Sequence, residues 1–254
     1  MNRFDSLVPT PDESRVFLSM LLRQQIPFVY DKIGDYQLEV MWDLWDTGRQ
    51  TCDGERSFPT SKDLLWEYWD TLKAVALKRL VLIGHWLHGP THGPDNEMLH
   101  ESEYRTMCEH AYFRYLDHTA PLLMTLTPAL IQFYGALRND TRRKVLVSSS
   151  LVATEAPQML QADSFIIPGP EDNRDPGEFL PQLSGQLNER DDDILILAAG
   201  PKSNLLLGHL LRYPSAADKT FINIGSGLDP LFLGKTRSEQ VEPEAAREYF
   251  KELL

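Results

Sequence analysis

The sequence predicts an α/β fold with a mostly parallel sheet and helices on both of its faces. Short apolar runs bounded by turn residues recur along the chain, and longer helical patterns separate them. Several runs, such as ILILAA and KVLVSS, are apolar on both faces, as is typical of strands buried in a parallel sheet. We therefore expect a single α/β domain over residues 1–254, with a helical segment at 1–26 and a C-terminal helix at 242–254.

The expected helices and strands follow from the spacing of apolar residues and from the residues that typically begin or end an element. The predicted strands are 27–33, 80–85, 144–148, 164–167, 194–198 and 220–224. The predicted helices are 12–25, 35–45, 61–77, 102–116, 128–138, 154–161, 203–211 and 244–253. Two helix starts, at Pro11 and Pro243, combine proline with acidic residues, which suit a first turn. The stretches 89–96 and 168–177 are rich in Pro, Gly, Asp and Asn, and are expected to be functional loops.

The composition of the chain disfavours several classes of protein. The chain has 25 Lys and Arg against 37 Asp and Glu, a net charge of −12, which disfavours a protein that mainly binds nucleic acid or anionic lipid. Cys52 and Cys108 are too few for a disulfide framework and lack zinc or redox spacing. No apolar stretch is long enough to span a bilayer, so we expect no membrane span and a cytoplasmic location.

The residues after the late strands carry the first candidate site, because ligands bind beyond the carboxyl ends of parallel strands. Gly200-Pro201-Lys202 follows the strand at 194–198 and leads into an apolar helix. Glycine lets the backbone approach a ligand, and a helix N-terminus favours phosphate. The segment is either a diphosphate site or a plain strand-to-helix turn.

The next strand is followed by Gly225-Ser226-Gly227 and then by Asp229 before a proline. This turn favours an anion, and the carboxylate could bind a ribose hydroxyl or a metal; alternatively, Asp229 only caps a turn. Because neighbouring strand ends converge on one pocket, we expect the two loops to form one site.

Two early segments are weaker candidates. Asp35 follows the first strand and could coordinate a divalent ion that bridges a diphosphate, or cap the next helix. His85, His88 and His92 share one short segment, but their spacing fits no zinc pattern. We expect these histidines to face substrate rather than to bind metal.

The remaining charged and aromatic clusters have structural interpretations. The acidic run 189–193 is expected to be a solvated connector, and the basic cluster a solvated turn at the sheet edge opposite the site; the cluster comprises Arg138, Arg142, Arg143 and Lys144. Four tryptophans at helical spacing indicate core packing; they are Trp42, Trp45, Trp66 and Trp69. The chain has no GxSxG and no glycine fingerprint after its first strand, which disfavours acyl hydrolysis and hydride transfer.

Four segments together resemble the GT-D fold glycosyltransferases. They are KIGDYQLE, KVLVSSSLVATEAPQMLQADSFIIPGP, ILILAAGPKSNLLLGHLL and KTFINIGSGLDPLFLGKTRSEQ. In that family a G-D-G-E type segment supplies a D-x-E metal and nucleotide-sugar motif, a late strand ends in A-A-G-P, and the next ends in I-D-I-G-S with a following D-P. The resemblance covers about residues 33–237 and implies a Rossmann-like domain.

The resemblance places Gly34 and Asp35 in the donor site, with Asp35 as the first acid of D-x-E. Gln37 stands where the family has glutamate, and an amide oxygen brings no charge to a cation. The implied Mn²⁺ or Mg²⁺ is then bound weakly by Asp35 and Gln37, is shared with Glu39, or has been given up.

The late motifs imply the remaining donor contacts. Gly200, Gly225 and Ser226 match the family and imply contacts to the diphosphate, while Asp229 implies contact to the ribose or the acceptor. Asn223 replaces the aspartate of I-D-I-G-S.

Pro201, Lys202 and Arg237 complete the expected donor site, with the two cations near the diphosphate. Asp35 is expected to position donor or metal, and the candidates for the catalytic base are His85, Glu155 and Asp229.

The implied activity is transfer of a sugar from a nucleoside diphosphate sugar, most simply a UDP-sugar, to an acceptor hydroxyl. The acceptor is a glycan or glycosylated molecule, or a modified base in DNA. The alternative is a relative of the fold that binds a nucleotide or glycan without catalysis, and Gln37 and Asn223 favour that alternative.

Overall fold

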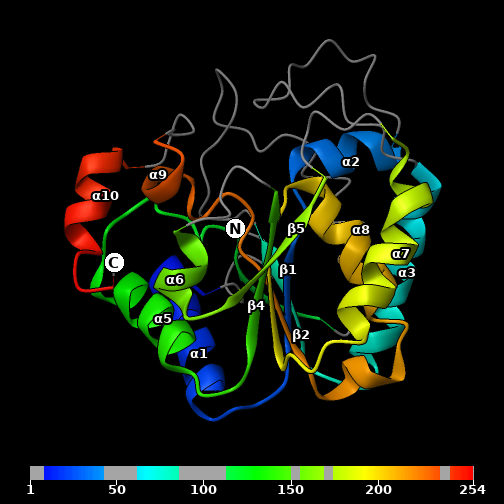
Figure 1. Cartoon of the computed structure of the whole chain (residues 1–254), viewed down its shortest axis with the longest axis horizontal. Helices are drawn as coiled ribbons and strands as arrows, with labels where there is room; N and C mark the ends of the chain where they lie inside the picture. The colour runs from blue at the N-terminus through cyan, green and yellow to red at the C-terminus, as the bar shows by residue number, and fades with distance from the viewer. Residues whose placement is uncertain are drawn as a thin grey trace, which may run out of the picture.

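The computed structural model describes residues 9–42, 62–85, 113–149, 155–168, 174–234 and 241–253. These residues form a seven-stranded sheet between two layers of helices (Figure 1). The strand order is β3-β2-β1-β7-β6-β4-β5, and every neighbouring pair is parallel. The predicted fold class, a parallel sheet with helices on both faces, is confirmed.

The strands lie close to their predicted positions, with one exception. They are β1 Val29–Lys32, β2 Val81–His85, β3 Arg114–Asp117, β4 Lys144–Ser149, β5 Asp163–Ile167, β6 Ile194–Ala198 and β7 Thr220–Asn223. The prediction of helix up to residue 116 is wrong, because residues 114–117 form the edge strand β3. In the part of the chain that the structure describes, this strand pairs with β2 alone. Its short RYLD sequence carries a charge at each end, so it lacks the continuous apolar run of a strand such as β6.

Helices cover both faces of the sheet (Figure 1). One layer contains α2 Asp35–Trp42, α3 Lys62–Ala76, α7 Pro176–Asn188 and α8 Pro201–Leu210. The other contains α1 Pro11–Arg23, α5 Pro128–Asn139, α6 Ala156–Leu160, α9 Asp229–Phe232 and α10 Pro243–Tyr249. A 3₁₀ helix, Pro214–Asp218, precedes β7. Helix α7 and the short α9 were not predicted; Pro181 within α7 interrupts the helical signal, although its apolar residues follow helical spacing.

The predicted start of α1 is confirmed by a capping box. The Thr10 hydroxyl accepts the Glu13 N–H at 3.3 Å, and the Glu13 carboxylate accepts the Thr10 N–H at 2.8 Å. Each contact satisfies an amide that has no partner within the helix. Among the described helices, none is long and apolar enough to cross a membrane.

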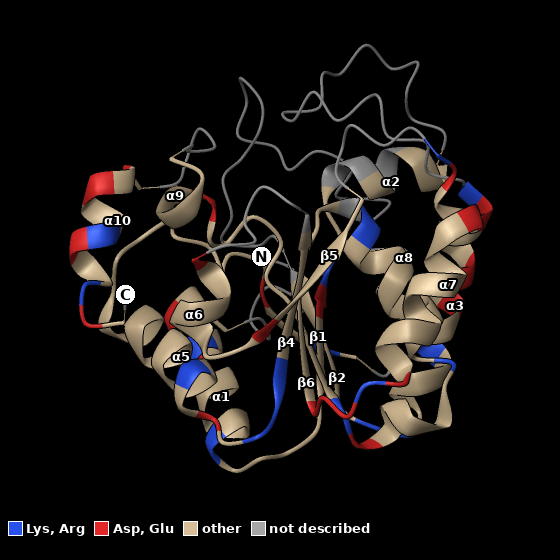
Figure 2. Cartoon of the chain, in the orientation of Figure 1, with Lys and Arg blue, Asp and Glu red and all other residues tan. Residues whose placement is uncertain are grey.

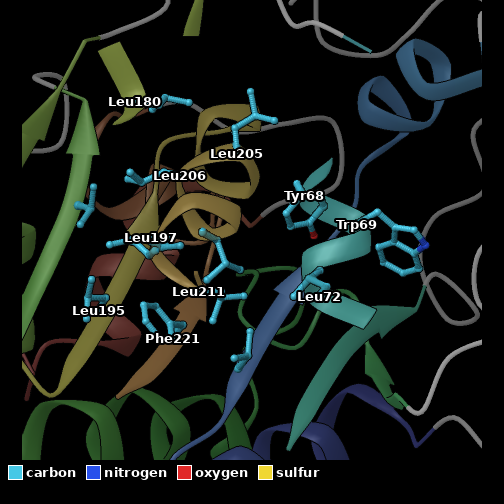
Figure 3. Packing of buried hydrophobic residues seen from close by; sticks show 14 of the residues in the cluster. Tyr68, Trp69, Leu72, Leu180, Leu195, Leu197, Leu205, Leu206, Leu211 and Phe221 are labelled. Carbon is cyan, nitrogen blue, oxygen red and sulfur yellow. The ribbon is translucent and has the colours of Figure 1, made fainter. Parts of the chain in front are cut away.

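Two hydrophobic cores lie on the two faces of the sheet, because successive strand side chains point to opposite faces. Leu195, Leu197 and Phe221 meet residues of α3, α7 and α8 (Figure 3), whereas Ile196 and Ile222 belong to the core that contains α1 and α5 residues. This explains why β6 is apolar at every position. The expected core role of the tryptophans holds for those described, since Trp69 is buried in the first core and Trp42 and Trp66 pack against it.

The order of the strands creates a topological switch point at β7. The chain leaves β1 and β6 toward α2 and α8 in one layer, but it leaves β7, which lies between them, toward α9 in the other layer (Figure 1). In α/β proteins, ligands bind beyond the carboxyl ends of strands at such a point. We therefore expect a ligand to bind at the loops after β1, β6 and β7.

Candidate functional site

The two glycine loops singled out from the sequence start from neighbouring strands. Leu197 of β6 pairs with Asn223 of β7, so Gly200 and Gly225 follow adjacent strand ends, as predicted. Gly200 has φ 57° and Gly225 has φ 52°, a region that side-chain-bearing residues rarely adopt. The local backbone therefore favours glycine at both positions.

A buried carboxylate, Asp31 of β1, organises this end of the sheet. It is fully buried and accepts hydrogen bonds from the Tyr68 hydroxyl, from Asn223 Nδ2 at 2.6 Å and from Asn204 Nδ2 at 3.2 Å. Burial raises the pKa of Asp31, although the hydrogen bonds from Tyr68, Asn223 and Asn204 act in the opposite direction. Burial also raises the pKa of Tyr68, and the Asp31 charge adds to that shift, so the phenol remains a donor.

Two asparagines connect Asp31 to the loops. Asn223 Oδ1 accepts the Gly225 N–H at 3.0 Å. Asn204 of α8 donates to Asp31 and to the Lys32 carbonyl, the latter at 2.8 Å, while its Oδ1 accepts Gln37 Nε2 at 2.8 Å. One carboxylate therefore fixes α8 and the loop after β7 relative to β1. We call these five residues the Asp31 network: Asp31, Gln37, Tyr68, Asn204 and Asn223.

Gln37 has a structural role that the sequence analysis did not predict. It is the third residue of α2, and its Oε1 accepts the N–H of Gly34, the residue before the helix, at 3.1 Å. A glutamine at this position caps the helix start. Its amide nitrogen is bound to Asn204, and only 7% of the residue is exposed. Both polar atoms of the Gln37 side chain therefore have partners within the protein. The side chains of Asp35 and Glu39 lie outside the described residues.

The contacts of the late loops differ from the expected ones. The Gly225 amide, expected to face a diphosphate, is used by Asn223. In the loop after β6, the Ala199 N–H donates to Ser203 Oγ, and the Ser203 N–H to the Gly200 carbonyl, both at 3.0 Å. The first residue of α8 is Pro201, which has no N–H. The amides of Ala199, Ser203 and Gly225 are therefore already bonded within the protein.

Lys202 is directed toward the end of β5. Only 2% of the residue is exposed, and its Nζ donates to the Pro168 carbonyl at 2.9 Å and lies 5.6 Å from the Phe179 ring centre. The other expected cation, Arg237, lies outside the described residues, as do His88 and His92.

The candidate catalytic bases lie on separate elements. His85 ends β2, and its side chain is not among those described. Glu155 is exposed before α6, and Asp229 begins α9, where its N–H donates to the Ser226 carbonyl at 3.1 Å. Among the side chains that the structure describes, no three His, Cys, Asp or Glu residues form a metal-binding group.

A buried lysine at the switch point escaped the sequence analysis. Lys32 is the last residue of β1 and is 9% exposed. A Cβ added to Gly84 would lie 3.2 Å from Lys32 Cβ, and one added to Gly225 would lie 2.7 Å from Lys32 Nζ. The side chain thus runs from the end of β2 to the loop after β7. Two charged residues in succession, Asp31 and Lys32, at the end of a buried strand were the signal that could have identified it.

The loop after β3 forms a second polar segment that was missed together with the strand. Asp117 and His118 are buried, and Thr119 donates to Asp117 Oδ1 through both its N–H, at 2.8 Å, and its hydroxyl, at 2.5 Å. A Cβ added to Gly227 would lie 2.5 Å from the Pro121 carbonyl oxygen. The loops after β3 and β7 are therefore packed against each other.

The basic cluster lies at the opposite, amino end of the sheet, as predicted (Figure 2). Arg142 pairs with Asp140 at 2.8 Å, and Arg143 with Asp191 at 3.3 Å. The Lys144 ammonium donates to two main-chain carbonyls. These cations have anionic or carbonyl partners within the protein, so the cluster does not favour a DNA acceptor.

The comparison with known proteins shows a shared fold. No family model and no curated protein matches it. A solved structure described as "The highly conserved domain of unknown function 1792 has a distinct glycosyltransferase fold" matches with a TM-score of 0.50 and 13% identity, over 85% of this chain and 82% of that chain. At this identity the match shows the fold alone, and it confirms the GT-D resemblance at that level.

Proposed function

We propose that this protein is a glycosyltransferase that moves a sugar from a nucleoside diphosphate sugar, a UDP-sugar in the simplest case, to an acceptor hydroxyl on a glycan. The observation that carries the proposal is the arrangement at the switch point. The Asp31 network connects β1, α2, α8 and the loop after β7 there, in a chain with a glycosyltransferase-like fold. Such a rigid framework suits a bound donor, because catalysis by positioning requires fixed groups.

The reaction places two demands on the residues around this point. The departing diphosphate gains charge that a cation or donor must stabilise, and an inverting reaction needs a base for the acceptor. Of the described base candidates, Asp229 is the one that follows β7, as the first residue of α9.

The free energy of donor binding is larger than a helix N-terminus alone can supply. A dissociation constant of about 10 to 100 μM corresponds to roughly 5.5 to 7 kcal/mol. A helix N-terminus supplies about 1 kcal/mol. Base stacking, ribose contacts and a cation must supply the rest. Because Gln37 is an amide that caps α2, the proposed metal site would draw its charge from Asp35 and Glu39.

Thermal denaturation with a panel of nucleotide sugars tests the proposal. A donor that binds only the native state stabilises it by about 2.7 kcal/mol at a hundred times its dissociation constant. We expect one nucleotide class to raise the melting temperature selectively, and the corresponding sugar to be transferred to a glycan acceptor. If no nucleotide sugar, with or without Mn²⁺, shifts the melting temperature of a folded sample, the proposal is wrong.

The second candidate is a binding protein without catalysis. The observation that favours it is the use of Gln37 and Asn223, which replace family acids, as internal hydrogen-bonding partners. Such a protein would show the same melting shift with a nucleotide sugar, but neither transfer nor hydrolysis of the labelled sugar. Product analysis of the stabilising donor therefore separates the two candidates.

A further inference from the structure

The side chain of Asp31 is the acceptor in each hydrogen bond that the structure describes for it. Its Oδ1 accepts from Asn223 Nδ2 at 2.6 Å and from the Lys32 N–H at 2.9 Å, and its Oδ2 accepts from the Tyr68 hydroxyl. Asn204 Nδ2 lies 3.2 Å from both oxygens. A carboxylate can accept at both of its oxygens, whereas a side-chain amide has one acceptor and one donor group. These surroundings therefore fit a carboxylate at position 31 and not an amide.

The loop after β7 fixes the direction of one of these contacts. A backbone N–H can only donate, so the Gly225 N–H, 3.0 Å from Asn223 Oδ1, turns the amide nitrogen of Asn223 toward Asp31. Asp31 must then accept. The first chain of hydrogen bonds thus runs from Gly225 through Asn223 to Asp31.

The loop after β1 is connected to the same carboxylate by a second chain. The Gly34 N–H donates to Gln37 Oε1 at 3.1 Å, which leaves Gln37 Nε2 to donate to Asn204 Oδ1 at 2.8 Å. The nitrogen of Asn204 in turn donates to Asp31. Two glycine amides, from loops after different strands, are therefore the starting points of two hydrogen-bond chains that end on one carboxylate.

The amides Gln37 and Asn223 stand where the resembling family has acids, and an acid at either position would oppose these chains. An aspartate at 223 would bring an oxygen against Asp31 Oδ1, where the Asn223 nitrogen now lies at 2.6 Å, and two carboxylates at that distance resist ionisation together. A glutamate at 37 would bring an oxygen against Asn204 Oδ1. The two amides and Asp31 are therefore chemically matched to one another.

We propose that Asp31 is a positioning residue that couples the two glycine loops of the donor site. Its carboxylate orients Asn223 and, through Asn204, Gln37, so that a change in one chain alters the order of the loop on the other. A buried polar network whose members are all paired holds its parts in one arrangement. Asp31 is fully buried and acts through these amides. This inference rests on the proposed function, because the proposed donor contacts the loops after β1 and β7.

Exchange of two side chains, Asp31→Asn together with Asn223→Asp, tests the first chain. Asp31→Asn alone places an amide against the Asn223 amide, and Asn223→Asp alone places two carboxylates together, whereas the double variant again pairs one donor with one acceptor. Isothermal titration calorimetry with UDP, with and without Mn²⁺, measures the effect. We expect each single variant to weaken UDP binding about tenfold and the double variant to recover most of that loss.

Asp140→Asn is the matched control. The Asp140 side chain is 1% exposed and pairs with Arg142 at the amino end of the sheet. This substitution also removes a buried carboxylate, and it should lower stability without changing UDP affinity. The control separates loss of a buried charge in general from loss of the coupling between the loops.

Amide hydrogen exchange of Gln37→Met without ligand tests the coupling between the two chains. Methionine has a similar length but neither hydrogen bond of Gln37. If Asp31 couples the loops, segment 224–228 should exchange faster in this variant than in wild type, although Gln37 belongs to the chain that starts at Gly34. Segment 138–144, at the amino end, should not change.

Three results would overturn the inference and leave the proposed function intact. They are wild-type UDP affinity in both single variants, a double variant that binds UDP no better than the weaker single variant, and unchanged exchange of segment 224–228 in Gln37→Met. If a variant at position 31 or 223 does not fold, as judged by circular dichroism, the exchange measurement on Gln37→Met decides the question. If wild type binds no nucleoside diphosphate, the proposed function is wrong, and the same exchange measurement still decides whether the loops are coupled.

Discussion

The two ends of the sheet use charge in different ways. At the amino end, arginines pair with carboxylates in nearby turns, and one pair, Arg143 with Asp191, is largely exposed. At the carboxyl end, the Asp31 carboxylate is buried and is held by amides and a phenol from α3, α8 and β7. Exposed pairs contribute little to stability, whereas a buried polar network fixes its members. The Asp31 network therefore connects the loops at the carboxyl end through neutral donors, whereas Asp140 and Asp191 at the amino end pair with arginines.

The substitution Asp31→Asn should have the largest effect on stability. The asparagine amide would face the donor groups of Tyr68, Asn204 and Asn223, so we expect a loss of about 2 to 4 kcal/mol in the free energy of unfolding. Asp191→Asn at the amino end is the control and should cost less than about 0.5 kcal/mol. Urea denaturation measures both. Equal losses would mean that the two ends do not differ as described.

Gln37→Glu tests the capping role of Gln37. The glutamate would bring an oxygen against Asn204 Oδ1 in place of the present donor, which should cost about 2 kcal/mol at neutral pH. Gln182→Glu on the exposed side of α7 is the control. If instead Gln37→Glu is as stable as wild type and binds Mn²⁺, then Gln37 occupies a working metal position.

Gly225→Ala and Gly234→Ala separate backbone strain from crowding. Both glycines have a positive φ, but a Cβ on Gly225 would lie 2.5 Å from Lys32 Cε, whereas nothing lies within 4 Å of one on Gly234. We expect Gly225→Ala to be less stable than Gly234→Ala by about 1 kcal/mol. Thermal denaturation of the two variants provides the comparison, and identical melting temperatures would place Lys32 away from Gly225.

The smallest expected effect is at Asp12, on α1. Burial acts to raise its pKa, but hydrogen bonds from Thr127 and Arg15 outweigh burial and lower the pKa below 3.8. Stability from Asp12 is therefore fully present above about pH 3.8 and is lost as the pH falls through the lower folded-state pKa. Because the side chain is half exposed, Asp12→Asn should cost only about 0.5 kcal/mol at pH 7.

Urea denaturation of wild type and Asp12→Asn at pH 7 and pH 3 checks this prediction. The difference between the two proteins should shrink at the lower pH. A difference that grows on acidification would contradict the lowered pKa of Asp12.

Local sequence patterns were sufficient for most of the fold. The central strands and most of the helices follow from apolar period and helix-start residues, and the loops at Gly200 and Gly225 follow from the rule that ligands bind after parallel strands. Strand β3 and helix α7 were missed because the first is short and charged at its ends and the second contains Pro181.

The Asp31 network could not be predicted in the same way. Its members lie at positions 31, 37, 68, 204 and 223, so their contacts depend on strand order and register rather than on any local pattern. The position of Lys32 could not be predicted for the same reason, since its neighbour Gly225 is far from it in the sequence.

Amide hydrogen exchange with and without a saturating nucleoside diphosphate compares both ends of the sheet in one sample. We expect added protection in segments 32–37, 199–204 and 224–228, and no change in segments 138–144 and 189–193. Protection confined to other segments, or equal protection at both ends, would contradict a donor site at the switch point.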